Sequence, residues 1–256
     1  MSPRAVWVWT RPEVHELLSW CQEHDVAAIF LSVPPNLAYG DETDDDLRWI
    51  RQVVRTAKDA GIEVSALGGD PGWVGHPAAG PSWLRAVLAT RLFHSVHLDI
   101  EPWARDDWDP SDADAVGHFV ELLRTLAAAC PLPLEADIPF WLHEVLTASG
   151  QPLDAVVMQI VDSVTVLSFR NTVTGPDSIT DVAAHALSTA TRLGIPCRLA
   201  VETNDLGPDP ESRKQTFFGA TQSALAQALE EVDAVEAGAA SYNGIGVEDY
   251  PGWRAL

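Results

Sequence analysis

The sequence predicts a single (β/α)8 barrel, the TIM barrel, spanning residues 1–256. Eight short apolar segments alternate with helical segments along the chain, and no change in composition divides it. The length of 256 residues, 46% of them hydrophobic, is typical of one such barrel. An open doubly wound sheet is the alternative, and the number of strands favours the barrel.

The predicted elements follow one another in a regular order. Strands are expected at residues 6–9, 26–33, 62–67, 96–101, 132–138, 164–169, 196–201 and 244–249. Helices are expected from residue 12 through 21 and at 46–60, 81–93, 112–129, 141–146, 153–161, 181–193 and 217–232. Residues 36–46, 106–111 and 205–213 are expected to be loops, and 237–243 fits either strand or loop.

Helix and strand limits are supported by proline and glycine. Pro12 opens the first helix, Pro34 follows the second strand and Pro102 ends the fourth. Gly61 and Gly194 follow two of the helices, as expected for glycine beyond a helix C-terminus.

The charge of the chain narrows the classes of partner. Sixteen basic and 37 acidic residues give a net charge of −21, which repels nucleic acid and anionic membranes. We therefore expect a small-molecule or oligosaccharide substrate and no cofactor, and the oligomeric state stays open. Three scattered cysteines without C-x-x-C spacing argue against a zinc ribbon, and no signal peptide is visible, so a cytoplasmic protein is expected.

The fourth strand carries the most informative pattern. Side chains alternate along it, with Val96, Leu98 and Ile100 on one face and His97, Asp99 and Glu101 on the other. Acids that end at a loop indicate a carboxylate site at the C-terminal end of a buried strand. A hydrogen-bonded polar layer in the core, or acids that face solvent on an edge strand, are the alternative interpretations.

Other strands also end in polar residues, which a barrel would gather at one mouth. The expected group is Asp70, Glu101, Asp137, Asn171, Glu202 and Glu248. Cleavage of a glycosidic bond needs a proton donor and a second carboxylate. We predict Glu101 as the general acid/base and Glu202, across the barrel, as the nucleophile or electrostatic stabiliser. Asp99 would raise the proton affinity of Glu101.

Further residues are candidates for contact with the substrate. They are Trp7, Trp9, Trp73, Trp103, Asp137, Asn171, Asn204, Glu248 and Tyr250. Aromatic rings suit the stacking of sugars, although tryptophan also fills cores. We expect His97 to hydrogen-bond Asp99, and Arg198 to pair with an acid inside the barrel, because an unpaired buried charge is costly.

The segment LDIEP at 98–102 resembles the fourth-strand motif of glycoside-hydrolase barrels. In the chitinase family this motif is D-x-x-D-x-D-x-E, whose last Glu is the acid and whose preceding Asp assists it. Asp99 and Glu101 match these two positions, whereas His94 and His97 stand at the earlier two. The resemblance therefore implies a glycosidase with half of the motif.

Two further segments resemble the same family. Residues 166–171 are similar to its sixth-strand M-x-Y-D segment, but Phe169 lacks the hydroxyl group and Asn171 is displaced. Residues 246–250 resemble its eighth-strand end, where an aromatic residue lies under the sugar. Tyr250 or Trp253 would take that place.

A second resemblance is to the large clan of retaining barrel glycosidases. Its acid/base Glu follows strand four, usually as Asn-Glu-Pro, and its nucleophile follows strand seven. Glu101 and Glu202 fit this placement, while Ile100 replaces the Asn. Both resemblances cover most of the chain at the level of the fold, which does not establish an activity.

Two other classes of function remain open. The expected mouth, with Glu135 added, is rich in hard oxygen ligands, so a Mg²⁺-assisted isomerase, lyase or cyclase is an alternative. No D-x-D pair joined to a histidine ligand supports it, and no metal-ligating residue is assigned. A non-catalytic sugar-binding barrel is the third class, because the chitinase-like motif is incomplete.

Overall fold

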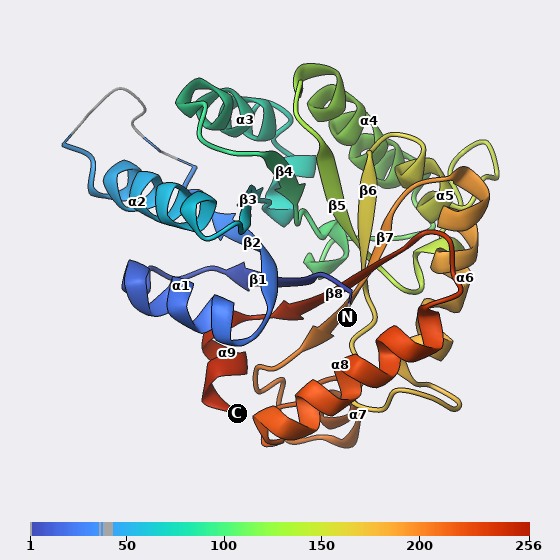
Figure 1. Cartoon of the computed structure of the whole chain (residues 1–256). Coiled ribbons are helices and arrows are strands. Elements are labelled where there is room, and N and C mark those ends of the chain that lie inside the picture. Colours follow the sequence, from blue (N-terminus) through green and yellow to red (C-terminus); the bar gives the residue numbers. More distant parts are fainter. Residues whose placement is uncertain (1, 36, 38–42) are drawn as a thin grey trace.

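The computed structural model describes residues 2–35, 37 and 43–256. Most of the predicted loop at 36–46 therefore lies outside the described residues. In the described part of the chain, eight parallel strands close into a barrel in the order β1 to β8, and β1 pairs with β8. The predicted (β/α)8 fold is confirmed (Figure 1).

The strands of the barrel correspond to the eight predicted apolar segments. They are β1 Arg4–Val8, β2 Val26–Ser32, β3 Glu63–Gly68, β4 Ser95–Leu98, β5 Leu134–Pro139, β6 Ser163–Leu167, β7 Cys197–Glu202 and β8 Tyr242–Glu248. Alternation divides their side chains between two cores. Alternate residues such as Val6 and Val8 pack outward against helices, whereas Ala5 and Trp7 point into the barrel.

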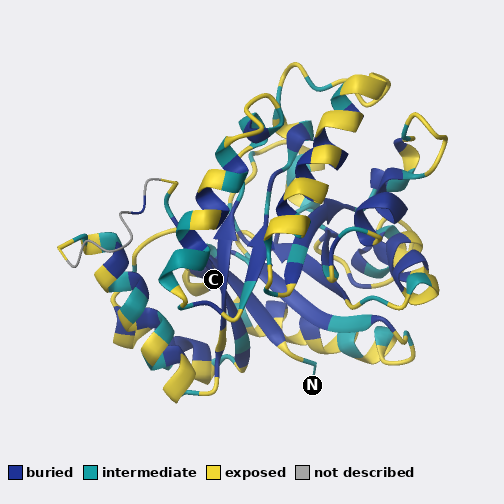
Figure 2. Ribbon diagram, turned by 90° about the horizontal axis from the view of Figure 1, so that it is seen from above, coloured by how far each residue is buried: buried dark blue, intermediate teal, exposed yellow. Residues whose placement is uncertain are grey.

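Helices surround the barrel and cover its outer wall. They are α1 Val14–Glu23, α2 Asp45–Asp59, α3 Ala79–Thr90, α4 Ala113–Ala129, α5 Leu153–Met158, α6 Ile179–Leu193, α7 Pro210–Lys214, α8 Gln222–Glu236 and α9 Tyr250–Ala255. Short 3₁₀ turns are η1 Pro71–Val74, η2 Pro102–Ala104 and η3 Leu142–Glu144. Figure 2 shows the buried strands at the centre and exposed residues on the outer faces of the helices.

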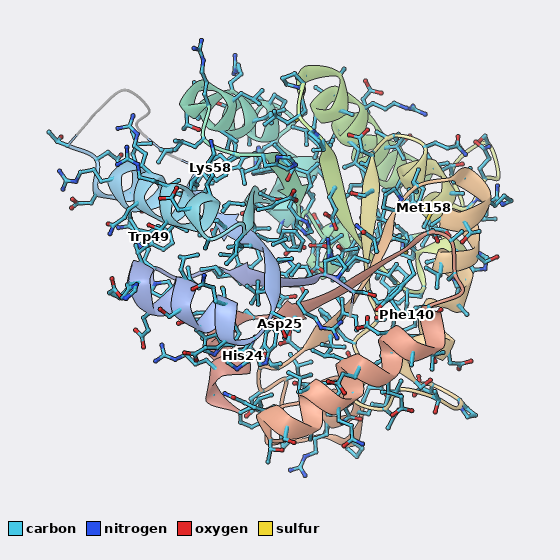
Figure 3. All side chains as sticks on the ribbon, viewed as in Figure 1. His24, Asp25, Trp49, Lys58, Phe140 and Met158 are labelled. Atoms are coloured by element: carbon cyan, nitrogen blue, oxygen red, sulfur yellow. The ribbon has the colours of Figure 1, made fainter. Side chains whose placement is uncertain are left out.

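Helix α2 illustrates how sequence sets an element of this outer layer. Asp44 caps it by accepting a hydrogen bond from the backbone N–H of Leu47 (2.9 Å). Its buried face carries apolar residues at helical spacing, among them Leu47, Ile50 and Val53. On its other side, the indole N–H of Trp49 donates to the carbonyl of Pro12 (3.0 Å), which links α2 to the segment before α1 (Figure 3).

Several predicted limits differ from the structure. Helix α8 starts at Gln222 rather than residue 217, because Thr221 caps it and Gly219 has a φ of 80°. The predicted helix at 141–146 is only the 3₁₀ turn η3, while α7 and α9 lie where no helix was predicted. Strand β4 stops at Leu98, and the backbone turns into the left-handed region at Glu101.

Candidate active site

The end of β4 is held against the end of β3. The backbone N–H of Asp99 donates to the carbonyl of Gly68 (3.1 Å). A Cβ at Gly69 would lie 1.8 Å from the carbonyl oxygen of Asp99, so only glycine permits this approach. The position of the Asp99–Glu101 segment thus depends on a glycine in the neighbouring strand-to-helix loop.

Glu101 occupies a strained backbone conformation directly after β4. Its φ of 42° and ψ of 57° are uncommon for a residue with a side chain, and such outliers gather at functional sites. Burial and the charges of Asp137 and Glu202 raise the pKa of Glu101 to about 7, although hydrogen bonding by the Trp103 side chain acts in the opposite direction. Glu101 therefore holds a proton near neutral pH.

Five carboxyl groups gather at the C-terminal ends of the strands. We call Asp99, Glu101, Asp137, Glu202 and Glu248 the mouth acids. Burial raises the pKa of each, and the charges of neighbouring acids raise it further. The convergence expected for strands four, five, seven and eight is therefore present in the structure.

Asp99 interacts electrostatically with Glu101 and Asp137 beyond the end of β4. The charges that raise the pKa of Glu101 come from Asp137 and Glu202. The pKa of Asp99 is itself raised well above its ordinary value by burial, Asp137 and Glu101. Because the repulsion between Asp99 and Glu101 is mutual, the proton on one favours the charge on the other, and the tuning of Glu101 by Asp99 stays a prediction.

His97 lies inside the barrel beneath the mouth acids. Its Nε2 is 2.8 Å from Oδ2 of Asp137, and its Nδ1 is 3.8 Å from Glu135, so the predicted bond to Asp99 is wrong. Burial disfavours the imidazolium, but these two carboxylates outweigh burial and raise the pKa of His97 to about 10. The ring also stacks on Phe30, with centroids 3.8 Å apart. His97 is a charged structural residue here.

Arg198 completes the charged layer under the mouth. Its Nε is 3.5 Å from Oε1 of Glu135, which also accepts a hydrogen bond from the hydroxyl of Thr165. Burial opposes ionisation of Glu135, but Arg198 and His97 lower its pKa to about 2. The prediction that Arg198 pairs with an acid inside the barrel is confirmed, and the acid is Glu135.

Glu202 is fixed in place at the end of β7. Its Oε1 accepts hydrogen bonds from the backbone N–H of Thr203 (2.6 Å), the backbone N–H of Asn204 (2.7 Å) and Nδ2 of Asn204 (2.9 Å). Burial raises the pKa of Glu202, while these donors lower it. The Asn204 side chain therefore positions a carboxylate, rather than pointing free into the mouth as a substrate contact.

Trp9 and Glu248 form one side of the mouth. The indole N–H of Trp9 donates to Oε1 of Glu248 (3.2 Å), and 36% of Trp9 is exposed. Glu248 is registered directly with Glu202 across β7 and β8. Among the tryptophans proposed as sugar contacts, Trp9 has both an exposed ring and a mouth acid as its partner.

The other predicted aromatic contacts are mainly packing residues. Trp7 is fully buried inside the barrel and meets His97 edge-on, and Trp73 packs beside Trp83 outside the barrel (5.5 Å between centroids). Tyr250 is 3% exposed and lies against α1. These rings lack the free face that stacking of a sugar needs. Trp103 is half-buried next to Glu101 and stays near the site.

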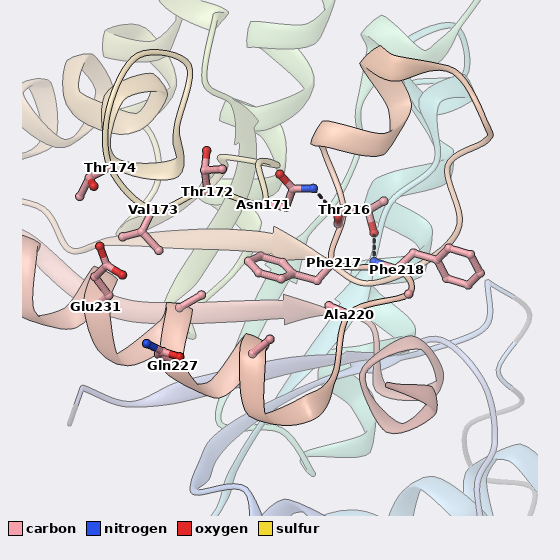
Figure 4. A pocket seen from close by; sticks show the side chains of 13 residues that line it. Asn171, Thr172, Val173, Thr174, Thr216, Phe217, Phe218, Ala220, Gln227 and Glu231 are labelled. Atoms are coloured by element: carbon pink, nitrogen blue, oxygen red, sulfur yellow. Dashed lines mark hydrogen bonds between the residues drawn. The ribbon is translucent and has the colours of Figure 1, made fainter.

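Asn171 lies in a different hollow from the mouth acids. Its Nδ2 donates to the carbonyls of Arg213 (2.8 Å) and Thr216 (3.1 Å). This hollow of about 630 Å³ lies between the loop after β6 and the start of α8, with Phe217 on its floor (Figure 4). The structure does not bring Asn171 together with the acids at the mouth.

Phe218 is a candidate contact that the sequence analysis did not single out. It is 57% exposed and follows a segment that pairs with the end of β7, where the N–H of Phe217 donates to the carbonyl of Glu202 (2.8 Å). No local signal marked it, because residues 217–232 matched a helical pattern. Its backbone therefore lies near the end of the strand that carries Glu202, while Phe218 is among the residues that line the hollow of Asn171.

Among residues 2–35, 37 and 43–256, no group of three or more His, Cys, Asp or Glu side chains has a geometry suited to a metal ion. Within the same residues, none of the helices combines the length and apolar character needed to cross a bilayer.

Comparisons with known proteins identify the fold. No protein-family model and no curated protein matches the sequence. A chitinase from Rhizomucor miehei superposes with a TM-score of 0.59 at 14% identity, covering 96% of this chain and 94% of the other. The chain has a chitinase-like TIM barrel. Chitinases recur among the solved structures with this fold.

Barrel proteins with other activities share the same architecture. The Bacillus cereus spore cortex-lytic enzyme SleL has a TM-score of 0.61 at 10% identity, covering 99% of this chain and 73% of that one. D-psicose 3-epimerase from Clostridium cellulolyticum H10 has a TM-score of 0.53 at 12% identity, covering 97% and 84%. At such low identity, the likeness establishes the fold and leaves the chemistry to the site.

Proposed function

We propose that this chain is a glycoside hydrolase in which Glu101 is the general acid/base. The observation that carries the proposal is the partly buried carboxyl group of Glu101, which a left-handed backbone conformation holds at the end of β4 and whose pKa burial and neighbouring acids raise to about 7. A general acid must hold its proton at working pH and release it in the transition state. The chitinase-like barrel supports a carbohydrate substrate.

Glu202 is the proposed second carboxylate of the reaction. Three N–H donors fix its Oε1, so its position is set before substrate binds. Glu202 would stabilise positive charge at the anomeric carbon, or attack that carbon directly. Its charge also helps to hold the proton on Glu101, which couples the two roles.

The proposed proton transfer proceeds from Glu101 to the oxygen of the leaving group. Departure of that group leaves an electron-poor sugar ring facing the Glu202 carboxylate, and water completes the hydrolysis. Glu101, now ionised, then accepts a proton from the water. The exposed ring of Trp9, beside Glu248, would contact the sugar.

Glu101→Gln tests the assignment of the general acid. We expect turnover of oligosaccharides or aryl glycosides to fall about 10²–10⁴-fold, the usual contribution of a positioned acid. Activity of the unsubstituted protein should also fall as the pH rises through about 7, since Glu101 then loses its proton. Glu121→Gln, on the exposed face of α4, is the matched control and should retain full activity.

The outcome also separates the alternative classes. Unchanged turnover in Glu101→Gln, with unchanged circular dichroism, would contradict the acid role. Sugar binding without turnover by the unsubstituted protein would identify a binding barrel. Activity that disappears with a chelator and returns with Mg²⁺ would support the metal-assisted class instead.

A further inference from the structure

The connection from β7 to α8 returns to the end of the strand from which it starts. Residues 203–221 make up this connection, and Thr216 forms a parallel bridge with Glu202. The backbone N–H of Phe217 donates to the carbonyl of Glu202 (2.8 Å). A later part of the connection is therefore fixed directly to the residue that carries the proposed second carboxylate.

Thr216 is a buried residue whose hydroxyl group links three backbone groups. Its Oγ1 donates to the carbonyl of Asn204 (2.7 Å), and the carbonyl of Glu202 lies 3.3 Å from the same oxygen. It also accepts a hydrogen bond from the backbone N–H of Phe218 (3.0 Å), as Figure 4 shows. Thr216 is 5% exposed, so the hydroxyl group is largely shielded from water. Valine has nearly the shape of threonine but can make none of these hydrogen bonds.

Asn204, whose carbonyl group Thr216 holds, supplies two of the three donors to Glu202. Its backbone N–H and its Nδ2 lie 2.7 and 2.9 Å from Oε1 of Glu202, and the backbone N–H of Thr203 is the third donor. In the part of the chain that the structure describes, no hydrogen bond is made to Oε2 of Glu202. The chain thus binds one carboxylate oxygen and leaves the other available.

Neighbouring segments restrict Asn204 and Thr216 from two further sides. A Cβ at Gly252 would lie 2.9 Å from Oδ1 of Asn204, so the start of α9 packs closely against that side chain. Nδ2 of Asn171 donates to the carbonyl of Thr216 (3.1 Å), which ties this part of the connection to the loop after β6. Asn171 therefore supports the position of Thr216.

The donors to Glu202 oppose the effect of the acids around it. Acidic side chains interact electrostatically with Glu202 from three segments: Glu101 after β4, Glu248 at the end of β8 and Asp249 at the start of α9. Burial and Asp249 raise the pKa of Glu202, whereas the hydrogen bonds to its Oε1 lower it. Loss of these donors should therefore raise the pH at which Glu202 ionises.

We propose that Thr216 is a positioning residue of the reaction, because its hydroxyl group holds Asn204 in the place where both N–H donors meet Oε1 of Glu202. Oε2 then stays available to the bound sugar, and the carboxyl group stays ionised beside three other acids. The role in catalysis depends on the proposed glycoside hydrolase, whereas the chain of hydrogen bonds from Thr216 to Glu202 does not.

Thr216→Val tests the proposal, because it removes the hydroxyl group with little change of shape. Against oligosaccharides or aryl glycosides, we expect kcat to fall about 10-fold while KM changes less than about 3-fold, since the group disturbed acts in the transition state. The acid limb of the pH–rate profile should move up by about 0.5–1 pH unit as the donors to Glu202 weaken. Thr216→Ser keeps the hydroxyl group and should restore kcat to within about 3-fold, with the acid limb back in place.

Two further variants control for packing. Thr216→Ala also lacks the hydroxyl group but is too small to clash, and it should give the same shift of the acid limb. Thr125→Val is the matched control, because the Thr125 hydroxyl on exposed α4 donates to a carbonyl of its own helix (2.8 Å), and it should change neither rate nor profile. An equal loss of turnover at every pH, with both limbs unmoved, would overturn the proposal. So would a Thr216→Ser protein as impaired as Thr216→Val.

A measurement without substrate separates this proposal from the proposed function. Carboxyl-carbon NMR follows ionisation of Glu202, whose signal is identified by its absence from Glu202→Gln. We expect its titration midpoint to rise in Thr216→Val and Thr216→Ala but not in Thr125→Val. Such a rise in a protein without turnover would reject the hydrolase and leave the hydrogen-bond chain standing. An unchanged midpoint in a protein that hydrolyses glycosides would retain the hydrolase and reject the role of Thr216.

Discussion

Replacing Glu101 by Gln should stabilise the protein at high pH and leave it nearly unchanged at low pH. The folded protein raises the pKa of Glu101 to about 7, whereas an unfolded chain has about 4.3 for Glu. The folded state therefore binds this proton more tightly, and stability falls as pH rises between these values. Above pH 7 the difference corresponds to roughly 3–4 kcal/mol, an upper value because neighbouring acids titrate together.

Thermal unfolding measured from pH 4 to pH 8 checks this expectation. A gain of about 3 kcal/mol corresponds to a rise of roughly 6–12 °C in melting temperature at pH 8 for a domain of this size. The two proteins should melt together near pH 4, where Glu101 is protonated in both states. Glu121→Gln on α4 should show no such pH-dependent difference. A constant offset between Glu101→Gln and the unsubstituted protein at every pH would refute the reasoning.

Two further predictions concern the supports of the site. Arg198→Ala should cost about 3–5 kcal/mol in urea unfolding at pH 7, because it removes the nearest arginine from buried Glu135; a loss below 1 kcal/mol would contradict this pairing. Gly69→Ala should destabilise by about 1–3 kcal/mol and reduce turnover, because its Cβ would meet the carbonyl of Asp99. The control is Gly117→Ala at an exposed position of helix α4, where the added Cβ has no atom outside the helix's own backbone within 4 Å. This change should stabilise the protein by about 0.5–1 kcal/mol. Equal effects of the two changes would rule out the steric argument.

The barrel was predictable because its signals are local and repeated. Apolar strands separated by amphipathic helices recur along the chain, so all eight strands were predicted, whereas some helix limits and the short elements η3, α7 and α9 were not. Helix α8 shows the reason, since residues 217–221 fit a helical pattern but Gly219 and Thr221 set the start. The strand at β4 was overextended because alternation continues through Glu101, whereas its left-handed backbone depends on tertiary contacts.

The site was predictable in its carboxyl groups but not in their connections. Alternation placed Asp99 and Asp137 on inward faces, and strand polarity placed them at the mouth. The choice of Asp137 as the partner of His97 depends on how neighbouring strands are staggered, which the sequence does not record. Burial of Trp7 and Tyr250 likewise depends on packing between distant segments, so composition alone overestimated the aromatic contacts.

The two charged layers of the barrel differ in a way that relates stability to function. In the lower layer, His97 and Arg198 offset the charge of Glu135 and of Asp137, so its buried charges have partners. In the upper layer, the mouth acids raise one another's pKa, and within the described residues none of them except Asp137 pairs with a cationic side chain. Neutral residues would fit these strand ends at lower electrostatic cost. The strained backbone of Glu101 and the repulsion among the mouth acids lower the stability of the fold at the carboxyl ends of the strands. Such a cost is expected at a site that exchanges protons with a bound substrate.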